Sequence, residues 1–175
     1  MSTTVTFAGN LADAPELHHT RENNKPFVTC RSRTNNGMSQ PMIVAIPAHH
    51  PLGTATATTQ ALKVDGVRRL VVLSGQVAHD GEGSFVGDGD VAAQLIQVYK
   101  NLQSILESAD GGLQNLISTT TYLTSVSDIV AYREAKLELS RTYWNDGPYP
   151  TNSVVVVSGL AHPRYRVEVS GLAVL

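Results

Sequence analysis

The chain has 175 residues, which is enough for one ordinary domain or for one small domain with an appendage. Its hydrophobic fraction of 42% and its formal net charge of −2 fit a globular protein, exclude a disordered one, and argue against nucleic-acid binding through bulk charge. The single cysteine excludes an internal disulfide framework, and the absence of a long apolar run or a signal-peptide pattern predicts a cytoplasmic protein without membrane contact.

Residues 1–41 differ from the rest and are predicted to form an N-terminal appendage. Val5–Ala8 and Phe27–Cys30 are short strand candidates, separated by a polar stretch with prolines. The segment resembles the opening hairpin of bacterial single-stranded-DNA-binding proteins over Thr4–Leu11, Ala14–Leu17 and Lys25–Val28. A five-stranded barrel cannot close from this fragment alone. Two interpretations stay open, a nucleic-acid-binding element and a leader upstream of an internal start at Met38.

A domain is predicted to begin at Met42 and to extend to Leu175. Ile43–Ile46 is a short apolar strand, and a second strand candidate ends at Val64. Asp65–Gly66 is a hairpin signal, because both central positions of a tight turn favour positive φ, and Leu70–Leu73 is the expected returning strand. The segment 78–89, rich in Gly and Asp, is predicted to be a mobile surface loop.

Two amphipathic helices are predicted next, separated by a strand. Asp90 is the expected N-cap of the first, which carries one apolar stripe and ends before Gly111–Gly112. The β-branched and aromatic run Leu116–Leu123 predicts the strand, and Ser127 or Asp128 is expected to cap the second helix.

Four consecutive valines, Val154–Val157, predict a central strand buried on both faces. The polar residues just before them, where the strand emerges from the core, are a natural place for a binding site. The last strand includes Tyr165–Ser170. The resulting order, β-β-β-α-β-α-β-β, predicts an α+β fold in which two helices cover one face of a mixed sheet. The uncovered face needs a partner, and self-association is the simplest cover.

From about Met42 to Leu175 the chain resembles the RidA family, also called YjgF. No single motif is diagnostic, but their joint order and spacing are specific. The motifs are Gln60–Ala61, Leu73–Val77, Asp90–Gln94 with Asn101–Leu102, Thr119–Thr124 with Asp128, Pro150 with Ser153, and Val167–Val169.

The resemblance implies a chorismate-mutase-like fold, a homotrimer and ligand clefts between subunits. The best-known members hydrolyse reactive 2-imino or enamine acids to 2-keto acids and ammonia without a metal or cofactor, so the implied partner is a small-molecule substrate. An imine carbon is electrophilic once its nitrogen is protonated, and a positioned water with one carboxylate can therefore suffice.

The resemblance also assigns candidate site residues. Glu168 stands where the family has a carboxylate that helps to position the attacking water, and the Ser74–Gly75 turn can meet the ligand with its backbone. Val154 stands where a backbone carbonyl also helps to hold water. Two positions depart from the family: Asn152 replaces an arginine that pairs with the substrate carboxylate, and Thr58 replaces a tyrosine. A neutral amide lacks the charged, bidentate fork of a guanidinium, so altered specificity is expected.

Structural interpretations of the same residues remain open. Asn152 is also consistent with an amide that caps the edge of a ladder, and Glu168 with a carboxylate that is solvated or paired with Arg166. The pairs His18–His19 and His49–His50 lack the ligand spacing of a zinc site, so no metal is expected.

Three functions follow in order of preference. The first is an imine or enamine hydrolase with altered specificity. The second is a non-catalytic trimeric member of the family that binds a metabolite or a protein. The third is nucleic-acid binding through the N-terminal segment, against which the net charge argues.

Overall fold

The structure is a computed structural model that describes residues 16–19, 26–29, 41–45, 59–144 and 148–175. In these ranges it contains β1 (Glu16–His19), β2 (Pro26–Thr29), β3 (Met42–Ala45), β4 (Leu62–Asp65), β5 (Leu70–Gln76), α1 (Val91–Ser108), β6 (Leu116–Leu123), α2 (Ile129–Trp144), β7 (Thr151–Val156) and β8 (Val167–Val174). Two short 3-10 turns, Leu113–Asn115 and Val126–Asp128, precede β6 and α2.

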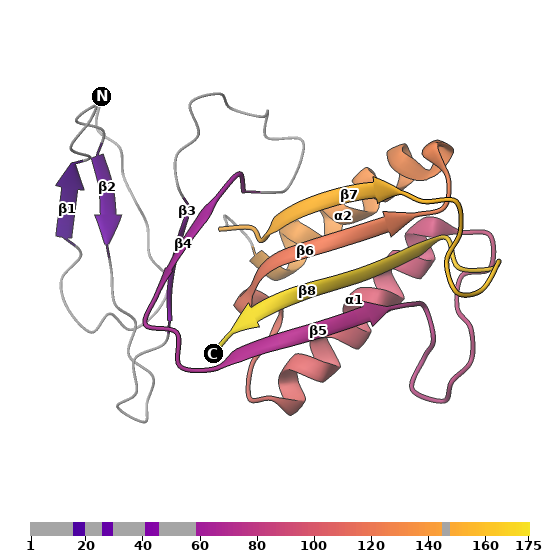
Figure 1. Cartoon of the computed structure of the whole chain (residues 1–175), viewed down its shortest axis with the longest axis horizontal. Helices are drawn as coiled ribbons and strands as arrows, with labels where there is room; N and C mark the ends of the chain where they lie inside the picture. Colours follow the sequence, from indigo (N-terminus) through magenta and orange to yellow (C-terminus); the bar gives the residue numbers. More distant parts are fainter. Residues whose placement is uncertain (1–15, 20–25, 30–40, 46–58, 145–147) are drawn as a thin grey trace.

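A four-stranded mixed sheet forms the centre of the fold, with strand order β5-β8-β6-β7. Strands β6 and β7 run parallel, whereas β8 is antiparallel to both β5 and β6. Both helices lie on the same side of this sheet, behind the strands in Figure 1. The predicted α+β fold, with two helices on one face of a mixed sheet, is confirmed.

The helices form because their apolar residues repeat at helical spacing and face the sheet. In α1 the fully buried side chains include Leu95, Val98 and Leu102. Asp90 caps this helix as predicted, because its Oδ1 accepts from the backbone N–H groups of Ala92 at 2.9 Å and Ala93 at 3.1 Å. No helix among the described ranges is both long and apolar enough to cross a bilayer.

The prediction that the valine strand is central and buried on both faces is wrong. Among the described strands, β7 pairs with β6 alone and forms an edge of the sheet. Val154, Val155 and Val156 are each 41–42% exposed in one chain. A run of valines indicates a surface that must be covered, but it does not indicate whether the same chain covers it.

The hairpin predicted at Asp65–Gly66 does not form, because the strands on either side of the turn pair with other strands. Gly66 has the positive φ of 74° that the turn signal implies. However, β4 pairs with β3 and β5 pairs with β8, so the strands on either side of the turn belong to different sheets. In the N-terminal segment, β2 overlaps the predicted Phe27–Cys30 strand and pairs with β1. The predicted Val5–Ala8 strand lies outside the described residues.

The loop between β5 and α1, predicted to be mobile, is held by many hydrogen bonds. His79 and Phe85 form an antiparallel bridge. Asp80 Oδ1 accepts from the backbone of Ser84 at 2.8 Å, and Asn101 of α1 donates to the carbonyl of His79 at 2.8 Å. Asp and Asn side chains bond the backbone here, and this composition therefore indicates turns rather than mobility.

Candidate functional site

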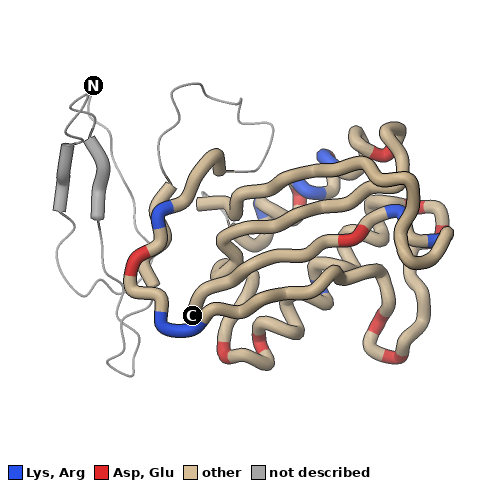
Figure 2. Tube along the Cα trace, viewed as in Figure 1, with Lys and Arg blue, Asp and Glu red and all other residues tan. Residues whose placement is uncertain are grey.

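Glu168 is the only Asp, Glu, Lys or Arg in the four strands of the central sheet. Figure 2 shows that the remaining charges lie mainly on the helices and loops. Glu168 is paired in register with Tyr122 of β6, and its neighbours Val167 and Val169 are fully buried on the helix side. Because side chains alternate along a strand, the carboxylate points to the face of the sheet that no helix covers.

A β-bulge in β5 shapes the backbone beside this carboxylate. Leu73 pairs with Gly171 and Gln76 with Val169, so Ser74 and Gly75 together oppose one residue of β8. A Cβ atom at Gly75 would lie 2.0 Å from the Glu168 Oε1 atom. Position 75 therefore has to be glycine for the carboxylate to rest against the bulge. The structure brings Ser74 and Gly75 close to Glu168, and the resemblance names all three as site candidates.

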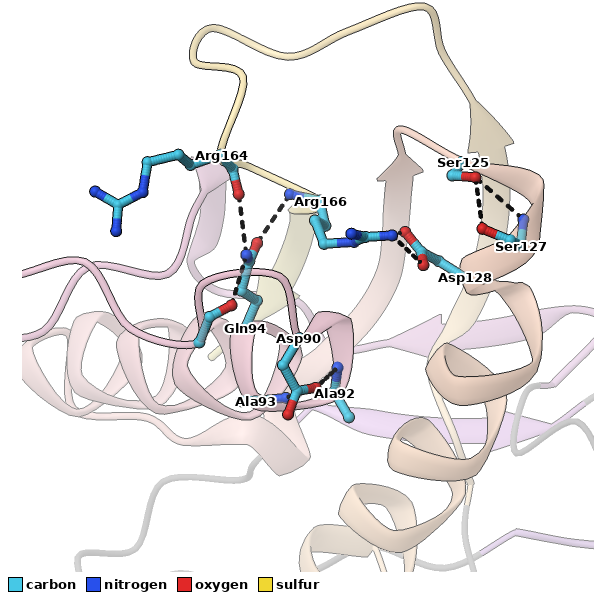
Figure 3. Close-up of polar contacts among 10 residues, drawn as sticks. Asp90, Ala92, Ala93, Gln94, Ser125, Ser127, Asp128, Arg164 and Arg166 are labelled. Atoms are coloured by element: carbon cyan, nitrogen blue, oxygen red, sulfur yellow. Dashed lines mark hydrogen bonds and ion pairs between the residues drawn. The ribbon is translucent and has the colours of Figure 1, made fainter.

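Arg166 does not pair with Glu168. Its guanidinium binds Asp128 through two contacts, Nε to Oδ2 at 3.0 Å and Nη2 to Oδ1 at 2.7 Å, as Figure 3 shows. Within the part of the chain that the structure describes, the Glu168 carboxylate has no cation and no hydrogen-bond donor. It is free to bind water or a ligand.

Three further residues on this face were not singled out as site residues from the sequence. Tyr122 and Thr120 of β6 are paired with Glu168 and Ser170 of β8, so these four side chains share the open face. The alternation of side chains along the Thr-rich strand could have indicated Tyr122, because every second residue from Thr119 to Leu123 is buried and Tyr122 lies between two of them.

Asn152 lies on the other face of the sheet. Its Oδ1 accepts from the hydroxyls of Thr119 at 3.0 Å and Thr121 at 3.1 Å, and its Nδ2 donates to the Tyr132 hydroxyl of α2 at 2.7 Å. Thr119, Thr121 and Tyr132 are buried. Asn152 therefore joins β7 to β6 and α2 beneath the helices, and within one chain it does not share a pocket with Glu168.

The remaining candidates are less informative. Val154 lies on the edge strand β7, two residues beyond Asn152. Thr58 lies outside the described residues. In the described ranges no group of three or more His, Cys, Asp or Glu side chains could hold a metal ion.

A separate pocket of about 100 Å³ lies between the loops that follow β5 and precede β8. Its lining consists of His79, Phe85, His162, Arg164 and Tyr165. Both ring nitrogens of His79 are engaged, Nδ1 with the Gly83 carbonyl at 2.9 Å and Nε2 with the Tyr165 hydroxyl at 2.8 Å. These rings pack on one another and join the two loops. We therefore place the candidate site at Glu168 and not in this pocket.

Comparisons with known proteins show which family this chain is similar to. The sequence model of a family described as Endoribonuclease L-PSP matches residues 50–175. The 2-iminobutanoate/2-iminopropanoate deaminase of Mus musculus is 32% identical over 117 residues, which cover 66% of this chain and 79% of that protein. A RutC family protein of Synechocystis is 29% identical over 139 residues, covering 79% of this chain and 98% of that protein.

Solved structures are similar as well. The crystal structure of RidA from Psychrobacter sp. PAMC 21119 is 28% identical, with a TM-score of 0.54, and the match covers 72% of this chain and 92% of that one. A Rid-family protein from Yersinia pestis has a TM-score of 0.67 at 24% identity, with 76% and 98% of the two chains covered, and supports the fold alone.

Proposed function

Because this chain belongs to the RidA family, we propose that it hydrolyses imines or enamines without a cofactor and that Glu168 activates the attacking water. The observation that carries the proposal is the unpaired Glu168 carboxylate on an otherwise uncharged sheet, held against the backbone of Gly75. A carboxylate without a cation beside it can accept a proton, whereas one in a bidentate ion pair is a weaker base.

The chemistry needs only this carboxylate and the bound substrate. Glu168 accepts a proton from water as the water oxygen forms a bond to the carbon of the protonated imine. The resulting carbinolamine receives a proton on nitrogen, the carbon–nitrogen bond breaks, and ammonia leaves while the oxygen loses its proton to form the carbonyl. The backbone of the Ser74–Gly75 bulge lies beside the carboxylate and can orient the substrate by hydrogen bonds.

The cleft in this proposal lies between subunits of a homotrimer. Glu168 and Asn152 point to opposite faces of one chain, so only a second copy can bring an Asn152 side chain to the Glu168 face. Strand β7 is an edge strand, and such strands present backbone groups that are not used by the ladder. This supports a backbone role for Val154 at the boundary between copies.

Altered specificity follows from position 152. Loss of a guanidinium removes a charge-assisted hydrogen bond to a carboxylate, a loss of roughly 1.5–3 kcal/mol. In addition, the Asn152 amide already has three hydrogen-bonding partners in its own chain. The preferred substrate is therefore an imine or enamine whose recognition does not depend on a carboxylate–arginine pair.

The experiment generates imines from a panel of amino acids with an amino-acid oxidase and follows their loss with semicarbazide as the trap. The wild-type protein should accelerate imine loss, and Glu168→Gln should reduce this by about 10²-fold or more. Gly75→Ala keeps the carboxylate but displaces it, and it should also lower the rate. The matched controls are Glu134→Gln, an exposed carboxylate on α2, and Gly159→Ala, where a Cβ has open space. Equal rates for Glu168→Gln and the wild type would contradict the proposal.

The second candidate is a non-catalytic binding protein, and the occupied Asn152 amide favours it. For this candidate no imine is consumed in the experiment above. A bound metabolite should instead raise the melting temperature of the protein, and Gly75→Ala should reduce this increase.

A further inference from the structure

Lys136 is a buried cation without a counter-ion. It lies on α2, is 2% exposed, and donates a hydrogen bond to the Tyr99 hydroxyl of α1. Its Nζ atom lies 4.3 Å from the centre of the Tyr99 ring and 5.2 Å from the centre of the Trp144 ring. Within the part of the chain that is described, no carboxylate lies within ion-pairing distance of Nζ. In the described part of the chain, two of its three N–H groups therefore have no acceptor.

Two more buried donors lie on the same stripe of α2. Ser140 and Trp144 follow Lys136 at intervals of four residues, a spacing that places all three side chains on one face of the helix. They are 1% and 7% exposed, and neither the Ser140 hydroxyl nor the Trp144 indole nitrogen has a hydrogen-bonding partner in the described structure.

The Ser140 hydroxyl differs from two other hydroxyls in these helices, those of Ser108 and Thr142. Those of Ser108 and Thr142 donate to the backbone carbonyl four residues earlier, at 2.9 Å and 3.0 Å. This bond is the usual solution for such a residue inside a helix. Ser140 does not make it, so its hydroxyl is directed elsewhere.

We propose that the layer between α1 and α2 binds one small monovalent anion, of the size of chloride or bromide, which accepts hydrogen bonds from Lys136, Ser140 and Trp144. All three unused groups can donate, and the indole and ammonium groups cannot accept. A buried polar group without a partner is costly, and a buried ammonium is more costly still. One anion satisfies the three donors and also neutralises the charge, whereas a water molecule does only the first.

The single tryptophan of the chain is Trp144, so its fluorescence reports on this site directly. The full-length protein is titrated with sodium bromide against sodium gluconate at constant ionic strength. The wild type should show saturable quenching that chloride reverses by competition. Lys136→Met should lose the saturable phase, and Ser140→Ala should weaken the affinity by about 2- to 10-fold, the equivalent of one hydrogen bond. The control Lys100→Met, an exposed lysine on α1, should behave as the wild type.

Crystals grown in bromide provide a second readout that does not depend on the variants. An anomalous peak within hydrogen-bonding distance of the three donors supports the proposal. Quenching that is linear and equal in the wild type and Lys136→Met would overturn it. Density for an ordinary water molecule among the three donors, with no anomalous signal, would overturn it as well.

Discussion

Lys136 makes the stability of the folded chain depend on pH in an unusual direction. Burial lowers the pKa of its ammonium from 10.5 to about 8, and the charge of Tyr132 opposes this shift only in part. The folded state thus releases a proton that the unfolded chain still holds between pH 8 and 10.5. Stability is lowest below pH 8, where both states are protonated, and rises through this window. Burial also raises the pKa of the Tyr99 and Tyr132 phenols, which reverses the trend above about pH 10.

Urea unfolding between pH 7 and 10 tests this prediction in gluconate buffer without a halide, so that no bound anion neutralises Lys136. The free energy of unfolding of the wild type should increase toward pH 10, by at most about 3 kcal/mol for a pKa shift of this size. Lys136→Met removes the titrating group, so its stability should be higher at pH 7 and nearly constant across the window. Lys100→Met is the matched control and should keep the increase. A parallel increase in Lys136→Met would assign the effect to another group.

At the scale of elements, Gln94 of α1 ties together two loops. Its Nε2 donates to the carbonyls of Gly87 at 2.9 Å and Arg164 at 3.0 Å, and its Oε1 accepts from the backbone N–H of Arg166 at 2.8 Å. Figure 3 shows these contacts beside the Arg166–Asp128 pair. Because Arg166 leads directly into β8, Gln94 helps to fix the start of the strand that carries Glu168.

Gln94→Met keeps the size of this side chain but leaves the Arg164 carbonyl and the Arg166 N–H without partners, whereas the Gly87 carbonyl still accepts from the Asp90 N–H at 3.0 Å. We expect a loss of about 3 kcal/mol in the free energy of unfolding, together with faster hydrogen exchange at the Arg166 amide. Gln103→Met, which removes only an exposed contact with Glu107, should change neither quantity. Unchanged exchange at Arg166 in Gln94→Met would show that the clamp does not hold the strand.

Local signals in the sequence predicted individual elements well and their partners poorly. The Asp90 cap and the apolar stripe of α1 depend on residues within one helix, and both predictions are confirmed. The turn at Gly66 has the predicted backbone conformation, but strand pairing depends on the C-terminal β8, about a hundred residues away. At the site, the resemblance to a family named Glu168 and Gly75 as candidates, and the structure places them in contact. That Glu168 is unpaired could not be predicted, because Arg166 is two residues away and its partner Asp128 is distant in sequence.

At the scale of the whole molecule, the open face of the sheet is a surface with many exposed apolar side chains. Val72 is 73% exposed and Leu70 is 57% exposed, and Leu172 and Val155 are exposed on the same face. An exposed apolar surface of this kind is usually covered by another chain. Glu168 lies on this face, so a second chain that covers the face would also form part of the proposed site.

We therefore predict that the protein elutes with three times the mass of one 18.7 kDa chain in size-exclusion chromatography with light scattering. Val72→Lys places a charge on the open face, on strand β5, and should shift the mass to that of a monomer, because an unpaired charge is not tolerated in a buried interface. Val126→Lys is the control, since Val126 is 68% exposed on the turn before α2, away from the sheet face. If the cleft lies between copies, Val72→Lys should also abolish imine hydrolysis although Glu168 and Gly75 are intact. Full activity in a Val72→Lys monomer would instead place the whole site within one chain.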